Sequence, residues 1–117
     1  MTAKFTLVPN STFKKDVTIP RAGAEDGVLT FTFKHKTRSQ LEALENTLRE
    51  ATEKQIEAGS HGSAPMVAFI EEIAAGWALP DEFNGENVLV LLENYPRAFD
   101  SIAMTYTREL MAIREKN

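Results

Sequence analysis

In the run from Val28 to Lys36, hydrophobic and polar residues alternate strictly from Leu29 to Lys34. A period of two is typical of a β-strand that is covered on one face only, and here Leu29, Phe31 and Phe33 form the apolar face. A second run with strand character covers residues 13–19 and ends at Pro20. The connection between the runs is long for a tight turn, so the pattern predicts two paired strands joined by a mobile loop. A further short strand at residues 4–8 is left open.

The remainder of the chain carries the three- and four-residue spacing of amphipathic helices. Four helices are predicted: from near Ser39 to Gly59, from near Pro65 to Gly76, from about Gly85 to Asn94, and from about Arg97 to Arg114. Ser39-x-x-Glu42 matches a capping box at the start of the first helix.

Two of these helices carry specific expectations about the core. Trp77 continues the apolar stripe of the second helix, so core packing is favoured over partner binding. The third helix is apolar on nearly all sides, so it should lie centrally in the core, with Leu91 buried. On the first helix, Glu45 with Arg49 and Glu50 with Lys54 are spaced to form ion pairs.

The predicted fold class is α+β, with an N-terminal β-hairpin or small antiparallel ribbon followed by about four α-helices. The chain has 117 residues, close to the commonest domain size. We therefore expect a single domain over residues 1–117, with a β-rich part at 1–36 and a helical part at 37–117.

Composition narrows the classes of function. The chain has no cysteine, which excludes a disulfide framework, a thiolate metal site and a cysteine nucleophile. Its formal net charge of −4 argues against non-specific nucleic-acid binding, which needs many lysines and arginines. No segment approaches the roughly twenty apolar residues that a membrane helix requires.

No constellation of residues points to catalysis. His35 and His61 lie in different contexts without patterned carboxylates, and the neighbouring carboxylates Glu71 and Glu72 are typical of a solvated helix face. No phosphate-loop, dinucleotide-binding or nucleophile-elbow motif is present. We expect no catalytic residue, no cofactor and no metal, and interpret the chain as a protein-binding module.

Two candidate binding surfaces remain. Met104 and Met111 lie one heptad apart and away from the main apolar stripe of the fourth helix, so they form a contact surface or are covered by another element. Phe31 and Phe33, on the apolar face of the second strand, are the next candidates.

Two stretches resemble a known family. The strand run from Phe13 to Pro20 is followed by the run from Leu29 to Arg38, and both resemble the opening of tail assembly chaperones from long-tailed bacteriophages and prophages. Gly76-Trp77, an acidic loop and the Leu91-Leu92-x-x-Tyr95-Pro96 break are similar to the helical half of that family.

The resemblance implies a role in tail assembly. Such chaperones bind the tape measure protein, keep it soluble and help to recruit tail tube protein. They act in the host cytoplasm, are absent from the finished virion and are not enzymes. This chain would match the shorter, non-frameshifted product, with self-association expected.

Two other functions stay open at this point. The first is a structural tail or neck component that is retained in the virion. The second is a small regulatory protein that binds nucleic acid through the basic run from Lys34 to Arg38.

Overall fold

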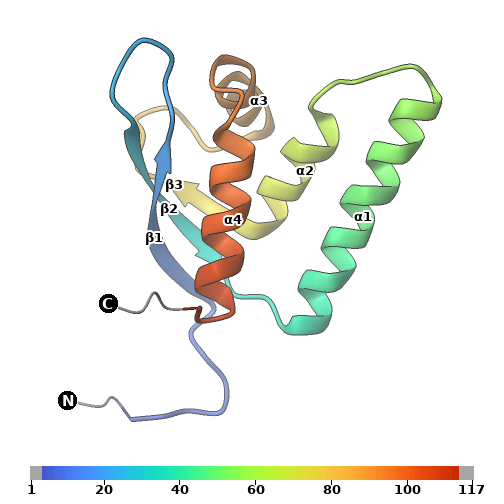
Figure 1. Cartoon of the computed structure of the whole chain (residues 1–117). Coiled ribbons are helices and arrows are strands. Elements are labelled where there is room, and N and C mark those ends of the chain that lie inside the picture. The colour runs from blue at the N-terminus through green and yellow to red at the C-terminus, as the bar shows by residue number, and fades with distance from the viewer. Residues whose placement is uncertain (1–3, 114–117) are drawn as a thin grey trace.

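The strands and helices of the chain are seen in a computed structural model that describes residues 4–113 (Figure 1). In chain order the elements are β1 (Thr12–Ile19), β2 (Gly27–Lys34), α1 (Arg38–Glu57), α2 (Ala64–Ile73), β3 (Ala74–Trp77), α3 (Gly85–Asn94) and α4 (Ala98–Leu110). The α+β fold class, with an N-terminal antiparallel strand pair followed by helices, is confirmed. The end predicted for the fourth helix, at Arg114, lies outside the described residues.

The sheet has the order β1-β2-β3, and both pairings are antiparallel. Val17 is opposite Leu29 in the first pair, and Phe31 is opposite Trp77 in the second. The third strand therefore comes from residues 74–77, within the half for which only helices were predicted. The strand considered at residues 4–8 is absent, since these residues have no strand pairing.

The prediction that the second helix continues to Gly76 is wrong, because the chain leaves α2 after Ile73 and becomes extended. Tertiary contacts explain this change. The Trp77 ring packs edge-on against Phe31 and Phe83, at centroid distances of 6.1 and 5.1 Å, and its Nε1 donates a hydrogen bond to the Asp81 carbonyl oxygen at 2.8 Å. A helical continuation would lose the pairing with β2 that makes these contacts possible.

The core lies between the sheet and the helices. α4 packs against β1, and α2 packs against β2 and β3, so the apolar face of β2 is covered (Figure 1). α1 packs against the outer side of α2. The fully buried side chains with the largest volumes are Tyr106, Phe31, Phe33, Ile70, Ile73, Ile102, Val17 and Val88.

α3 is peripheral, so its predicted central position is wrong. Val88 and Leu92 are buried one turn apart, but Leu89 and Val90 are exposed. Leu91 is only partly buried and packs against the edge of the core. The outer side of α3 is therefore apolar and exposed, so the apolar sequence of this helix did not mean that it is buried on all sides.

The start of α1 is also two residues earlier than its predicted capping box. The Thr37 hydroxyl accepts from the Gln40 backbone N–H, and the Gln40 side chain accepts from the Thr37 backbone N–H. This reciprocal pair has the same chemistry as the motif expected at Ser39 and Glu42.

Candidate interaction surface

Met104 and Met111 lie on the outward side of α4 and at its C-terminal end. The side of α4 that faces the sheet buries Ala98, Ile102 and Tyr106. Met104 is 63% exposed and Met111 is 59% exposed, so the alternative in which both are covered by another element is wrong. Two large apolar side chains are therefore open to solvent on one side of one helix.

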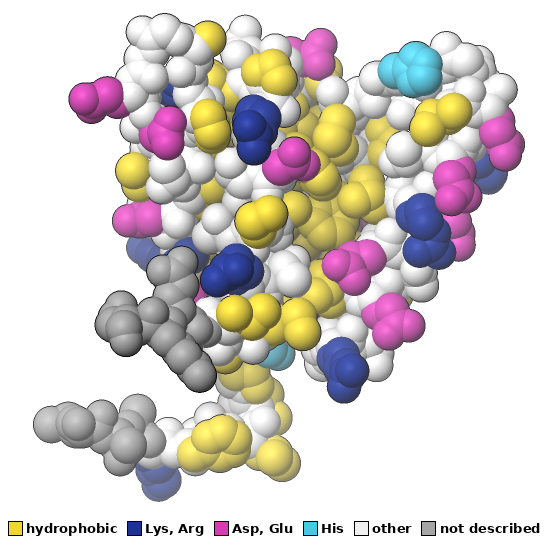
Figure 2. Space-filling model, viewed as in Figure 1, with side chains coloured by type: hydrophobic (Ala, Val, Ile, Leu, Met, Phe, Trp, Pro, Cys, Tyr) yellow, Lys and Arg dark blue, Asp and Glu magenta, His cyan; other side chains and the backbone are white. Residues whose placement is uncertain are grey.

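Both methionines line concave parts of the surface. Met111, with Leu41 and Leu110, lines a groove of about 480 Å³ between the end of α4 and the start of α1. Met104, with Ala103, lines a depression of about 440 Å³ on α4. We call these five residues the methionine surface. Figure 2 shows apolar side chains gathered over α4 and in the hollow between α4 and α1.

An aromatic pair joins α4 to α2. Phe99 of α4 packs edge-on against Phe69 of α2, with ring centroids 5.9 Å apart. Phe69 is buried, whereas Phe99 is partly exposed at the edge of the core. The pair joins the two helices, and Phe69 also lines a separate groove between α1 and α2.

Charged groups surround the methionine surface with an excess of cations. The side chains lining the same two concavities include Lys36, Arg38, Arg97 and Arg108 but a single carboxylate, Asp100. Within residues 4–113, none of these five groups has an ion-pair partner. Because the chain as a whole has a net charge of −4, this positive rim differs in sign from the protein that carries it.

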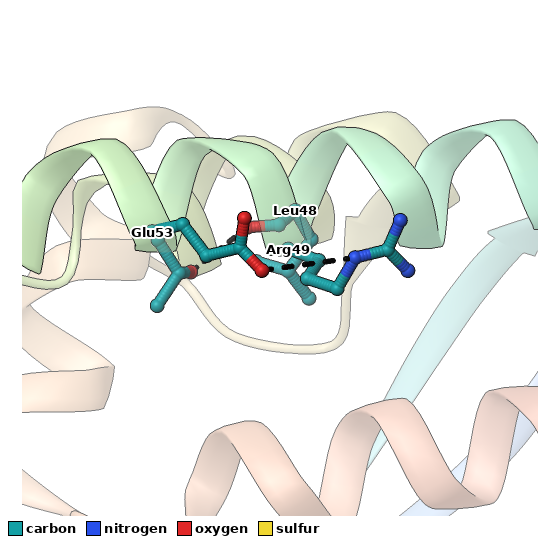
Figure 3. Close-up of polar contacts among 4 residues, drawn as sticks. Leu48, Arg49 and Glu53 are labelled. Atoms are coloured by element: carbon teal, nitrogen blue, oxygen red, sulfur yellow. Dashed lines mark hydrogen bonds and ion pairs between the residues drawn. The ribbon is translucent and has the colours of Figure 1, made fainter.

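The outer face of α1 is different in character. Arg49 Nε lies 3.9 Å from Glu53 Oε1, and the Thr52 hydroxyl donates to the Leu48 carbonyl oxygen at 2.8 Å (Figure 3). The predicted ion pairs of Glu45 with Arg49 and of Glu50 with Lys54 are not formed among the described residues. Exposed pairs of this kind contribute little stability, so this face is a solvated surface.

Phe31 and Phe33 are not on any surface open to a partner. Both have no exposed area, and Phe33 lies 5.1 Å from the Tyr106 ring and 5.4 Å from the Phe31 ring, between centroids. The strict alternation in β2 identified the covered face correctly. The element that covers it could not be identified from the alternation, and it is α4 together with α2.

The two histidines line different concavities. His35 lines the groove that contains Met111, and His61 lines a separate concavity between α2 and α3. Across residues 4–113, no group of three or more His, Cys, Asp or Glu side chains is arranged to hold a metal ion. No helix in the same range is long and apolar enough to cross a membrane.

The fold and this surface define a small α+β protein that presents an apolar, cation-rimmed helix face. A comparison with protein families identifies the group to which it belongs. The model of the phage tail assembly chaperone family matches residues 1–117, so the chain belongs to the phage tail assembly chaperone family. No curated protein and no solved structure gives a significant match.

Proposed function

We propose that this chain binds the tape measure protein, keeps it soluble and helps to recruit tail tube protein during tail assembly. In this proposal it acts in the host cytoplasm without catalysis or a cofactor, associates with itself and is absent from the finished virion. The family supports a role in tail assembly. The observation that carries the proposal is the exposure of Met104 and Met111 on one side of α4.

The methionine surface suits a helical client. An amphipathic helix binds by laying its apolar side in a groove between helices, and methionine adapts to clients of varied shape because its side chain is unbranched and polarizable. The cationic rim adds a preference. It favours a client helix whose apolar side is flanked by aspartate or glutamate.

The experiment is coexpression of the tape measure protein with the double variant Met104→Lys and Met111→Lys. The variant should fold with a near-normal melting temperature, because both side chains are exposed. The tape measure protein should become insoluble, since two ammonium groups would occupy its apolar binding site.

A matched control places two lysines on other exposed apolar positions, Ile56→Lys on α1 and Val90→Lys on α3. This control should keep the client soluble. If the methionine variant is folded and solubilises the client as well as the control does, the methionine surface is not the client site.

Mass spectrometry of purified particles tests the remaining part of the proposal. The chain should be missing from mature virions. A stoichiometric amount in the particles would identify a structural tail component instead.

A further inference from the structure

A second apolar feature lies before β1, in residues 4–10, which we call the arm. Phe5, Leu7 and Val8 are 88%, 92% and 79% exposed, more than any other large hydrophobic residue among those described. Figure 1 shows the arm running away from the helices and the sheet. Three neighbouring apolar side chains in water indicate a segment that is covered by a partner.

A groove of matching character lies between α1 and α2. It has a volume of about 600 Å³ and is lined by Leu44, Thr47, Leu48, Ala51, Pro65, Ala68, Phe69, Glu71 and Glu72. The apolar residues come from both helices, and the two carboxylates come from the C-terminal half of α2. Neither Glu71 nor Glu72 pairs with a cation within residues 4–113.

We propose that the arm of one copy binds the α1–α2 groove of a second copy. The arm bends at residues 7–8, so in this proposal it straightens on binding; Phe5 and Leu7 then point to the same side and both reach the apolar floor of the groove. Lys4 starts from the opposite side of the arm, and its long side chain reaches over the rim of the groove to Glu71 and Glu72, which lack a cation within residues 4–113. The contact is heterologous, because the arm and the groove are different surfaces of the chain.

The structure at the base of the arm favours binding to the groove of a second copy over binding to the groove of the same chain. The Ser11 carbonyl oxygen accepts a hydrogen bond from the His35 backbone N–H at 2.8 Å, which fixes the point where the arm leaves the sheet. Pro9 fixes one backbone dihedral angle just before this point, which limits the paths open to the arm. The arm bends at residues 7–8, where the Thr6 hydroxyl donates a hydrogen bond to the Val8 carbonyl oxygen at 3.1 Å, and its path leads away from the helices (Figure 1).

This interface gives the proposed self-association a structure, and it does not depend on client binding. The groove shares no residue with the methionine surface. Both surfaces can therefore be occupied in one molecule, so copies joined arm to groove could line up along a long client.

Sedimentation of the purified chain without any client tests the proposal. The average mass of the wild type should rise between about 1 µM and about 100 µM, a range typical of weak association. The arm variant Phe5→Ser with Leu7→Ser should associate about tenfold or more weakly, because two apolar contacts are lost without any change of charge. The groove variant Ala68→Arg should do the same and stay folded, since Ala68 is exposed.

Two controls carry matched changes beside these positions. Thr6→Ser changes the arm between Phe5 and Leu7 without adding a charge, and Ala43→Arg changes an exposed residue of α1 that does not line the groove. Both controls should associate like the wild type. Self-association by the arm and groove variants at the level of the controls would overturn the proposal, as would a wild type that stays monomeric throughout.

Mixing the two deficient variants gives the sharpest result. The arm variant keeps an intact groove and the groove variant keeps an intact arm, so an equimolar mixture should form a heterodimer at concentrations at which each variant alone is largely monomeric. A mixture that remains monomeric contradicts a direct arm-to-groove contact. The Met104→Lys and Met111→Lys variant should still self-associate, so failure of the client proposal and failure of this one give different results.

Discussion

The Tyr106 hydroxyl of α4 donates a hydrogen bond to the Lys34 carbonyl oxygen at the end of β2, at a distance of 2.8 Å. The two residues are 72 positions apart in the chain. The Tyr106 ring has no exposed area and lies against the rings of Phe13 and Phe33. This bond therefore joins the last helix to the sheet at the place where the chain turns toward α1.

Replacing Tyr106 with phenylalanine should lower the free energy of unfolding by about 0.5–1.5 kcal/mol, the usual contribution of one hydrogen bond. The ring packing is kept, while the Lys34 carbonyl oxygen loses its donor. Urea denaturation measures the difference. A variant as stable as the wild type would show that water replaces the hydroxyl without loss.

The same tyrosine predicts a loss of stability at alkaline pH. Desolvation by burial raises the pKa of Tyr106 to about 12, above the ordinary value of 10.0. Below pH 10 the hydroxyl is neutral in both the folded and the unfolded state, so its full contribution is present. Between pH 10 and about 12 the unfolded state releases the Tyr106 proton before the folded state does. The free energy of unfolding therefore falls as pH rises through this range. Denaturation at several pH values should show a steeper decline for the wild type than for Tyr106→Phe.

Trp77 joins β3 to the core and should be structural. Trp77→Ala should lower the free energy of unfolding by about 2–4 kcal/mol, somewhat less than for a fully buried tryptophan. Trp77→Phe is the matched control, since it keeps an aromatic ring but cannot donate to the Asp81 carbonyl oxygen, and it should cost less. Thermal and urea melts compare the three proteins. An alanine variant that melts like the wild type but fails to bind the client would make Trp77 an interface residue.

The strand pair and the positions of most helices were predictable because their signals are local. Alternation in β2 and the spacing of Phe69 and Ile73 depend only on which residues face the core. β3 was not predictable in this way, because its four residues become a strand through pairing with β2 and through the contacts of Trp77. Tertiary contacts override local pattern at this point.

The candidate surface was predicted in part for the same reason. The displacement of Met104 and Met111 from the main stripe of α4 is a local feature, and their exposure agrees with it. The cationic rim is not local, because Lys36 and Arg38 lie at or just before the start of α1, whereas Arg97 precedes α4 and Arg108 lies within it. The tertiary packing of α1 and α4 decides how these two groups of charges lie relative to each other.

Two valines of α3 test the peripheral position of this helix. Val88→Ala should lower the free energy of unfolding by about 1–3 kcal/mol, because Val88 has no exposed area. Val90→Ala should change it by less than about 0.5 kcal/mol, since Val90 is exposed and alanine favours helix. Chemical denaturation of both variants gives the comparison. Equal losses would mean that α3 is buried on both sides.

The sign of charge around the methionine surface gives a test of client choice. Arg97→Glu with Arg108→Glu should weaken binding of the tape measure protein by about tenfold or more, because carboxylates would face the acidic flanks proposed for its helices. The wild-type interaction should weaken as salt is added, and the variant should lose much of this dependence.

The matched control makes the same change in net charge elsewhere. Arg49→Glu with Lys54→Glu alters two exposed cations of α1 that do not line either concavity of the methionine surface. Binding measured by titration calorimetry with a soluble tape measure fragment should be close to that of the wild type. If both double variants weaken binding equally, the effect comes from net charge and the rim around Met104 and Met111 does not select the client. If only the change at Arg97 and Arg108 weakens it, the client lies across α4, with its acidic side chains against those two arginines.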